Sequence, residues 1–376
     1  MKRIAVLGCG LVGAAIARDL SREADFEVLV ADASAEALGR VKAQAGVRIR
    51  EADLSSPSEI AAVVREADTV VGALPGRLGL PMLEAVISAG KPIADISFSP
   101  EDPLALDALA RERGVTAVVD CGVSPGLSNF AVGRAAAALA SIDDVRILVG
   151  GLPVDRTRPF GYAILFSATD VIEEYTRPAR IVEEGRVVIR AALSEVEAVE
   201  VAGIGTLEAF LTDGLRTLLA TVPARSMVEK TLRYPGHAAA MRGLRESGFF
   251  DARPIDAGGR SISPRSVTEK LLSVAWKLRE GEEEFTYLRV SVAGRDASGA
   301  AKTSLFELLD RPGPGGTTSM ARTTGFPCSV AAAMLARGQY RAPGIRPLEL
   351  LAADPGASGR FLEGLRARGL VFHESF

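Results

Sequence analysis

The chain has 376 residues, of which 48% are hydrophobic and 24% charged, and its formal net charge is −3. This length predicts two domains, and the composition is that of a globular protein with a large core. The slightly negative charge and the lack of basic runs argue against nucleic acid or an anionic membrane surface as a partner. No apolar stretch approaches the roughly 20 residues that a membrane-spanning helix needs.

Three cysteines, Cys9, Cys121 and Cys328, lie far apart in the sequence. Their odd number and the lack of a Cys-x-x-Cys or Cys/His spacing predict free thiols in a reducing compartment and no metal site. The N-terminus reaches its first glycines before an apolar core of signal-peptide length develops. We therefore expect a cytoplasmic protein.

Residues 2–32 carry the clearest pattern in the chain. The apolar run at residues 4–7 predicts a buried strand, and a helical pattern follows directly after a glycine-rich turn. A second apolar run, residues 26–30, ends at Asp32. The turn has the form G-x-G-x-x-G and consists of Gly8, Cys9, Gly10, Leu11, Val12 and Gly13.

In a strand–turn–helix unit this spacing predicts a dinucleotide site. Gly8 makes the tight turn, Gly10 lets the backbone approach a pyrophosphate, and Gly13 lets the helix lie close to the strand. The helix N-terminus offers free N–H groups to the phosphates. Asp32, about 20 residues further on, is placed to bind both hydroxyls of the adenosine ribose.

The same aspartate bears on the choice of cofactor. A carboxylate repels a 2′-phosphate, and the two residues after Asp32 supply no arginine to hold one. The sequence therefore favours NAD over NADP, although Arg40 lies near enough in the sequence to weaken the preference.

Strands and helices alternate up to residue 122, which predicts a doubly wound parallel sheet and a Rossmann domain over residues 1–122. Further strands are expected at residues 47–50, 69–71, 92–94 and 115–119, with helices at 34–45, 57–65, 80–89 and 104–113. Ligands bind such sheets at the carboxyl ends of the strands. Residues that follow the third and fourth strands therefore join the predicted cofactor site: Asp53, Leu54, Ala73, Leu74 and Pro75.

From residue 123 the pattern changes to alternating strands, which predicts an α+β substrate domain over residues 123–324, built on an open antiparallel sheet. The expected strands lie near residues 145–149, 187–190, 226–232, 287–292 and 303–309, and the expected helices at 130–140 and 266–278. The last segment, residues 325–376, is expected to be helical and to pack back on the first domain.

Several motifs resemble the saccharopine dehydrogenase superfamily: the opening turn, Asp95-Ile96-Ser97-Phe98, and residues 120–129. Within that superfamily the second domain is most similar to the L-lysine 6-dehydrogenase family, at residues 150–153, 193–197, 207–210 and 230–237. The resemblance implies an NAD-binding Rossmann domain joined to an α+β substrate domain, and a homodimer. It also implies oxidative deamination of an amino acid, with L-lysine losing its 6-amino group to give ammonia and a semialdehyde that cyclises.

Oxidation of an amine needs a group that removes a proton from its nitrogen. Asp95 and Asp120 follow the fifth and sixth strands, so either could accept the ammonium or act as the base; the alternative is that they cap helices or tie loops. His237 is a third catalytic candidate, since an imidazole titrates near neutral pH. The alternative is that His237 has a structural role, as a residue at the start of a helix that hydrogen-bonds to the backbone.

Substrate carboxylates favour arginine, which binds them with two parallel hydrogen bonds. Arg216 and Arg233 lie in the motif segments and are our candidates, and Cys121 is expected to pack beside the substrate rather than to act as a nucleophile. L-lysine 6-dehydrogenases tend to carry small polar residues in place of Arg216. Saccharopine-type enzymes place a carboxylate-binding arginine at about this position, so Arg216 could bind a second substrate carboxylate. This leaves open a dehydrogenase of the saccharopine or carboxynorspermidine type, acting on a secondary amine. A separate alternative is an NAD-binding regulator without turnover.

Overall fold

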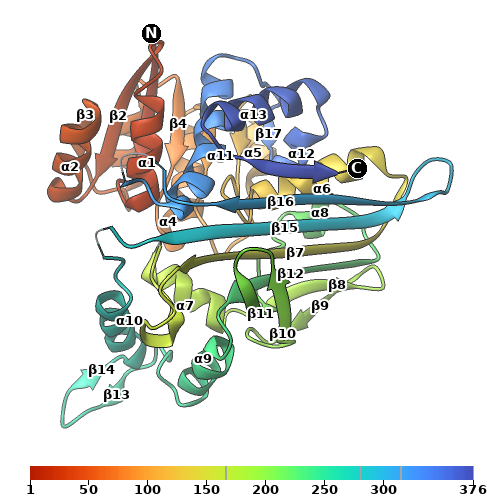
Figure 1. Cartoon of the computed structure of the whole chain (residues 1–376). Coiled ribbons are helices and arrows are strands. Elements are labelled where there is room, and N and C mark those ends of the chain that lie inside the picture. The colour runs from red at the N-terminus through yellow and green to blue at the C-terminus, as the bar shows by residue number, and fades with distance from the viewer. Residues whose placement is uncertain (166, 280, 314–315, 376) are drawn as a thin grey trace.

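Two large sheets organise the chain in the computed structural model, which describes residues 1–165, 167–279, 281–313 and 316–375. The N-terminal sheet lies beside a second sheet, whose long strands cross the middle of the molecule (Figure 1). Helices of the C-terminal segment lie next to the first domain and above the second sheet (Figure 1). No helix in these ranges is long and apolar enough to cross a membrane.

The first sheet has seven strands, paired in parallel throughout, in the order β17-β6-β5-β4-β1-β2-β3. It confirms the predicted doubly wound parallel sheet. The strands are β1 (Lys2–Leu7), β2 (Phe26–Asp32), β3 (Arg48–Glu51), β4 (Thr69–Gly72), β5 (Ile93–Asp95), β6 (Thr116–Val118) and β17 (Gly344–Ile345). The connecting helices are α1 (Leu11–Leu20), α2 (Ala35–Ala45), α3 (Pro57–Val64), α4 (Gly76–Ser88), the 3-10 turn η1 (Pro103–Leu106) and α5 (Asp107–Glu112).

Local chemistry explains where these helices begin. The hydroxyl of Ser34 accepts a hydrogen bond from the N–H of Ala37 at the start of α2, and Ser56 caps α3 ahead of Pro57. The strand order reverses between β1 and β4, so the glycine turn after β1 opens at the switch point of the sheet. Ligands of open parallel sheets bind at this point.

The second sheet is mixed, which corrects the antiparallel expectation. Its order is β10-β11-β12-β7-β15-β16-β18, and β12 runs parallel to β7 while the other pairs on this path are antiparallel. The hairpin β8–β9 attaches to β12. The strands are β7 (Ser141–Pro153), β8 (Ala179–Glu183), β9 (Arg186–Arg190), β10 (Glu197–Val201), β11 (Gly205–Leu211), β12 (Ser226–Arg233), β15 (Glu284–Arg295), β16 (Ala301–Asp310) and β18 (Phe372–Ser375).

Alternating residues of β15 show how this sheet is covered on both faces. Leu288, Val290 and Val292 belong to a core that also contains residues of α6 (Leu127–Ala138), α11 (Ser319–Ala336) and the Rossmann sheet. Phe285 and Tyr287 point the other way, into a second core. That core includes residues of α7 (Ala168–Thr176), α9 (His237–Glu246) and α10 (Pro264–Ala275). The remaining short elements are η2 (Pro159–Gly161) and α8 (Leu218–Thr221).

The C-terminal segment contacts both sheets. Helix α11 begins at Ser319, ahead of the boundary expected at residue 325, and packs against α1. It is followed by α12 (Leu348–Ala352) and α13 (Pro355–Ala367). Strand β17 extends the Rossmann sheet beside β6, while β18 pairs with β16 of the second sheet.

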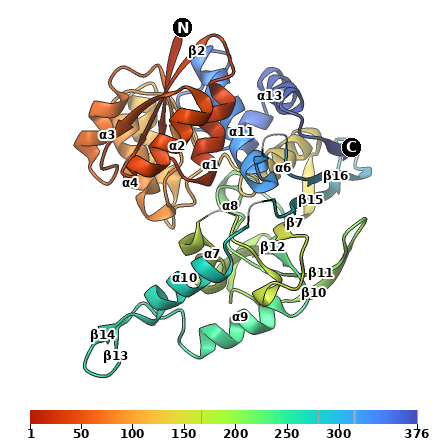
Figure 2. The same cartoon turned by 60° about the vertical axis from the view of Figure 1, so that its left-hand side comes forward.

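One part of the second domain projects from its body. It contains α9, α10 and the small hairpin of β13 (Ile255–Asp256) and β14 (Ser261–Ile262) (Figure 2). Along α10, Val267, Leu271 and Val274 are all exposed. Their spacing places them on one face of the helix.

Candidate active site

A cavity of about 390 Å³ starts at the glycine turn of the Rossmann sheet and extends into the second domain. At the end formed by the first domain it is lined by Gly8, Gly10, Leu11, Val12, Gly13, Asp32, Ala73, Leu74 and Pro75. At the end formed by the second domain its polar lining comprises Tyr162, Ser167, Asp170, Glu173, Glu174, Arg177, Thr212, Asp213, Glu229, Thr231 and Arg233. We call these the cofactor end and the substrate end.

The glycines of the turn are required by close packing on one side and leave space on the other. A β-carbon at Gly8 would lie 2.3 Å from the carbonyl oxygen of Ala73, and one at Gly13 would lie 2.2 Å from the carbonyl oxygen of Gly8. A β-carbon at Gly10 would meet nothing within 4 Å. The open space beside Gly10, at the N-terminus of α1, fits the pyrophosphate of a dinucleotide.

Asp32 is held in place by backbone donors. One carboxylate oxygen accepts the N–H of Cys9 at 2.6 Å and the other accepts the N–H of Ser34 at 2.8 Å. Arg40, the cation that could have held a 2′-phosphate, pairs with Glu36 at 2.5 Å. Asp32 therefore reaches the cavity with no cation bound to it in the part of the chain that the structure describes.

Three of the predicted cofactor residues do not line the cavity. Cys9 points into the protein, where its thiol lies 3.5 Å from the carbonyl oxygen of Ala37 and burial raises its pKa to about 11. Leu54 packs in the core beneath the sheet. Asp53 accepts hydrogen bonds from the N–H and hydroxyl of Ser55 and so orders its own loop.

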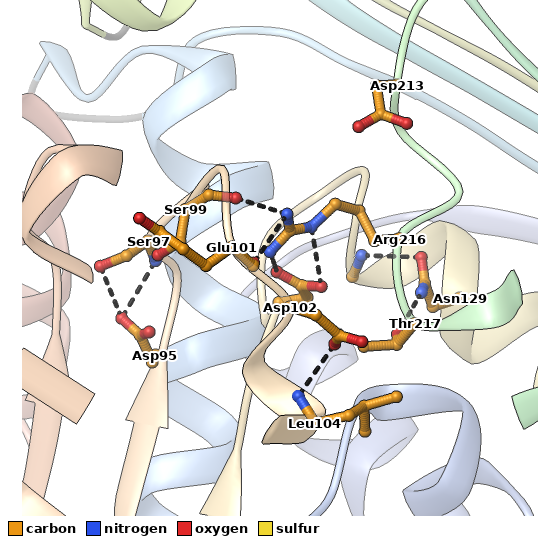
Figure 3. A network of polar contacts seen from close by, with 12 residues as sticks. Asp95, Ser97, Ser99, Glu101, Asp102, Leu104, Asn129, Asp213, Arg216 and Thr217 are labelled. Atoms are coloured by element: carbon orange, nitrogen blue, oxygen red, sulfur yellow. Dashed lines mark hydrogen bonds and ion pairs between the residues drawn. The ribbon is translucent and has the colours of Figure 1, made fainter. Parts of the chain in front are cut away.

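Arg216 and Asp120 form a buried ion pair between the two domains rather than a substrate site. The guanidinium binds both carboxylate oxygens of Asp120, at 3.1 and 3.2 Å, and each side chain is 2% exposed. It also donates to the carbonyl oxygen of Ser99 in the loop after β5 (Figure 3). With these bonds made, Arg216 is not free for a substrate carboxylate, nor Asp120 for an amine.

Asp95 is also held behind the cavity wall. One of its oxygens accepts the N–H of Ser97 at 3.0 Å and the hydroxyl of Ser97 at 2.8 Å (Figure 3). Burial, opposed by these two bonds, raises the pKa of Asp95 to about 7. Its neighbours Ile96 and Phe98 line the cavity, and Asp95 does not. The structure thus gives both aspartates the loop-tying role that was the alternative.

His237 has both ring nitrogens occupied in the core below the substrate end. Nδ1 lies 2.9 Å from the carbonyl oxygen of Phe160 and therefore donates, which leaves Nε2 to accept the hydroxyl of Tyr175 at 2.9 Å. Burial and the nearby charge of Arg233 lower the pKa of His237 to about 3. The imidazole is neutral and does not line the cavity, so it is in no position to accept a substrate proton.

Cys121 is fully buried and does not line the cavity either. Its thiol contacts that of Cys328 on α11, and burial together with this contact raises the pKa of Cys328. Cys121 therefore packs between the Rossmann sheet and α11, without contact to the substrate space.

Arg233 is the substrate-binding candidate that does line the cavity, but it is already engaged. Its guanidinium donates to Glu174 at 2.6 Å and to the carbonyl oxygen of Leu232 at 2.9 Å, and it stacks on the ring of Tyr162. Burial raises the pKa of Glu174, while the charge of Arg233 opposes that shift. Arg233 therefore serves to hold Glu174 and Tyr162 at the wall.

The polar residues of the substrate end, of which only Arg233 was selected as a site residue from the sequence, come mainly from one helix face and one strand face. On α7 and at its C-terminal cap, Asp170, Glu173, Glu174 and Arg177 follow the i, i+3, i+4, i+7 spacing of one helix face. On β12 every second residue from Glu229 faces the cavity, and Thr231 and Arg233 follow it. Polar residues on these two periods were a readable signal, since a buried face is normally apolar.

Most charges at the substrate end are matched by the protein. Glu173 pairs with Arg265 at 2.5 Å, and Asp213 pairs with Arg180 at 2.8 Å. Two arginine nitrogens, Nη1 of Arg177 and Nε of Arg233, are buried with no hydrogen-bond partner among the described residues, although Arg177 also lies 3.6 Å from Glu173. The Nη1 atom of Arg177 fits a ligand carboxylate.

Together, the Rossmann switch point and the cavity shared with a mixed-sheet domain define a two-domain protein with a nucleotide-binding site facing a polar pocket. Residues 4–118 match the saccharopine dehydrogenase NADP binding domain, and residues 122–370 match the saccharopine dehydrogenase C-terminal domain. The chain belongs to the saccharopine dehydrogenase family, as the motifs predicted.

Individual relatives are distant. The NADP(+)-dependent, L-glutamate-forming saccharopine dehydrogenase of Schizosaccharomyces pombe is 20% identical, with 100% of both chains covered. Carboxyaminopropylagmatine dehydrogenase of Synechocystis sp. is 22% identical over 100% of this chain and 98% of its own length. The mitochondrial alpha-aminoadipic semialdehyde synthase of Bos taurus is 22% identical over 99% of this chain, which spans 47% of that protein. The apo saccharopine dehydrogenase of Saccharomyces cerevisiae has the same fold, with a TM-score of 0.81 at 17% identity over 100% of both chains.

Proposed function

We propose that the protein is an NAD-dependent oxidoreductase that acts on a C–N bond of a small amino acid, with the 6-amino group of L-lysine as its first candidate. The observation that carries the proposal is the single cavity that joins the dinucleotide turn to a charged pocket in the second domain. Relatives named for the oxidation of saccharopine and of carboxyaminopropylagmatine support the same class of reaction.

The residues at the cofactor end fit a nicotinamide dinucleotide. Gly10 and the N-terminus of α1 would hold the pyrophosphate, and Asp32 would hold the adenosine ribose. When bound, this group supplies the acceptor for a hydride. The matching domain is described as NADP binding, but the carboxylate of Asp32 and the pairing of Arg40 with Glu36 support NAD.

The substrate end supports an amine with a single carboxylate. Arg233 is bound to Glu174 at 2.6 Å, whereas Arg177 lies 3.6 Å from Glu173, so Arg177 is the arginine more available to a ligand. One nitrogen of each, Nη1 of Arg177 and Nε of Arg233, is buried without a partner among the described residues. One available arginine suits one carboxylate, whereas saccharopine carries three. A second candidate is therefore a secondary amine with one carboxylate, as in carboxynorspermidine. A regulator without turnover would not need the unmatched charges of this pocket.

A substrate panel tests the proposal. Purified protein is mixed with NAD or NADP and with L-lysine, L-ornithine, L-saccharopine or carboxynorspermidine, and formation of the reduced nicotinamide is followed by absorbance. We expect NAD to be reduced with L-lysine or carboxynorspermidine. No reduction with any pair would contradict an enzymatic function and favour the regulator.

Asp32→Ala tests the cofactor end. We expect it to weaken NAD binding by about 1.5–3 kcal/mol, because it removes the hydrogen bonds that the ribose hydroxyls would donate to the charged carboxylate. Titration of NAD and NADP measures this, and the same variant is expected to lose its preference for NAD. An unchanged dissociation constant would remove Asp32 from the site.

We also propose that the enzyme works as a cytoplasmic homodimer. The apolar stripe of Val267, Leu271 and Val274 on α10 supports pairing with a second copy, because a monomer would leave it in water. The molecular mass in solution, measured by light scattering, tests this assembly.

A further inference from the structure

Glu229 is the one acidic residue of β12 that faces the cavity, and the protein leaves its charge unmatched. Its side chain is buried, and one carboxylate oxygen accepts the hydroxyl of Thr212 at 2.6 Å. The N–H of Gly214 donates a second bond. No described cation pairs with it, although Glu173, Glu174 and Asp213 in the same wall each have an arginine partner.

The surroundings of Glu229 make its proton movable near neutral pH. Burial raises its pKa to about 8, with the bond from Thr212 opposing this and the charges of Glu174 and Asp213 adding to it. Arg233 lies four residues further along the same strand. It is bound to Glu174 and therefore does not neutralise Glu229. The other charged groups at this end come from the face of α7: Asp170, Glu173 and Arg177.

A chain of hydroxyl groups continues from this carboxylate along the wall. Thr212 Oγ1 lies 2.6 Å from the Glu229 oxygen and 2.8 Å from Thr231 Oγ1, and all three side chains line the cavity. Hydroxyl groups both donate and accept, so this row provides a short path for a proton away from the carboxylate.

We propose that Glu229 is the catalytic base that binds the substrate ammonium and takes a proton from its nitrogen. The inference rests on the proposed amine oxidation and assigns its proton acceptor. The N–H bond breaks, an O–H bond forms on the carboxylate, and the electron pair stays on nitrogen, where formation of the C=N bond requires it. An ammonium also supplies a cation for this carboxylate, which has none among the described residues.

The decisive variant is Glu229→Gln, which keeps the size of the side chain and removes the base. We expect turnover with the substrate found in the panel to fall on the order of 100-fold or more, as is usual for loss of a proton acceptor. In the wild type, kcat/KM is expected to rise with pH through about 8, the pKa that burial gives to Glu229. The variant should lack this rise. Glu229→Asp, which retains a carboxylate, should keep the rise at a lower rate.

A binding measurement gives a readout without turnover. Calorimetric titration of L-lysine into protein saturated with NADH, in buffers with different ionisation enthalpies, reports the protons released on binding. At about pH 7, the wild type should release close to one proton, because the ammonium displaces it from the carboxyl group of Glu229. Glu229→Gln should release none. Glu284→Gln is the matched control, because burial raises the pKa of Glu284 to about 7 away from the cavity lining.

The outcomes separate this inference from the proposed function. If Glu229→Gln keeps the wild-type rate, pH profile and proton release, Glu229 is not the base, and the proposed function stands. If the wild type itself oxidises no amine and does not bind a nicotinamide dinucleotide, the proposed function fails and the inference fails with it. Unfolding midpoints of the three variants check that each one is folded.

Discussion

The two ends of the cavity are built in different ways. At the cofactor end, the wall consists of backbone and small residues from two short runs, residues 8–13 and 73–75. At the substrate end, it consists of charged and hydroxyl side chains from α7, the loop after β11, and β12, which lie far apart in the sequence. One end is defined by local geometry and the other by tertiary packing.

This difference predicts how each end responds to change. The cofactor end is sensitive to added volume, because its glycines lie against carbonyl oxygens, and Asp32 is the one charged side chain among the residues that line it. The substrate end is sensitive to the removal of charge, because three of its acids, Glu173, Glu174 and Asp213, are each paired with an arginine. Three substitutions test the comparison.

Arg216→Ala is expected to have the largest effect. It leaves Asp120 as an unpaired buried carboxylate, which should lower the free energy of unfolding by about 3–5 kcal/mol. Urea denaturation measures the loss. Replacing both partners, Arg216→Met with Asp120→Asn, should cost less, because no charge is left unpaired and asparagine tolerates the left-handed backbone at position 120 (φ 49°).

A different result would return Arg216 to the substrate site. If Arg216→Ala raises KM while the unfolding free energy stays unchanged, the guanidinium binds a substrate carboxylate in solution. Arg216 would then count as a ligand-binding residue of the substrate end rather than as a structural ion-pair partner.

The pH dependence of stability tests the wall behind the substrate end. His237 is neutral in the folded protein because burial lowers its pKa to about 3, while the unfolded chain binds a proton below about pH 6.5. The contribution of the buried neutral imidazole to the free energy of unfolding is therefore fully present above pH 6.5 and is lost as the pH falls. Between about pH 6.5 and 5, the wild type should lose roughly 2 kcal/mol more than His237→Gln does.

His373→Gln is the natural control, since His373 is exposed and is the only other histidine. It should follow the wild type at every pH. Parallel stability curves for wild type and His237→Gln would show that the imidazole is already accessible to protons, and would reopen a catalytic role for it.

Gly10→Ala should give the smallest effect, confined to the cofactor end. A β-carbon there meets no protein atom within 4 Å, so the unfolding midpoint should not change. It would occupy the space assigned to the pyrophosphate and should weaken NAD binding about tenfold, or ~1.4 kcal/mol. The control is Gly39→Ala, equally open but within α2, which should leave binding unchanged and add about 1 kcal/mol of stability. Equal affinities for all three proteins would mean that the dinucleotide does not lie over Gly10.

The contrast between the two ends also explains what could be read from the sequence. The Rossmann sheet was predictable because each of its signals is local: an apolar run, a glycine turn, a capping serine. The mixed second sheet was not, because the parallel pairing of β7 with β12 joins residues 82 positions apart in the sequence, such as Asp144 and Ser226, and leaves no local trace. Charge alone was also misleading, since Arg216 and Asp120 satisfy each other rather than a ligand.

For the site, ten residues selected from the sequence line the cavity: nine belong to the cofactor end, and Arg233 belongs to the substrate end. Residue type suggested His237 and Asp95, but their hydrogen bonds turn them inward. Glu229 and Arg177 escaped notice because a lone acid on a strand, or a lone arginine at a helix end, is usually on the surface. The packing of β12 and α7 turns both side chains toward the cavity, where Glu229 is buried and Arg177 is half-buried.

The C-terminal segment has a consequence for how the protein is made. Strand β17 covers the β6 edge of the Rossmann sheet, α11 covers α1, and Arg337 and Arg368 pair with Asp25 and Asp19 of the first domain. A ribosome delivers these groups after the whole of the second sheet except β18. The nucleotide-binding half therefore remains unfinished while the substrate half is made, with an open strand edge and an uncovered helix, and it becomes complete only when the substrate half is already present.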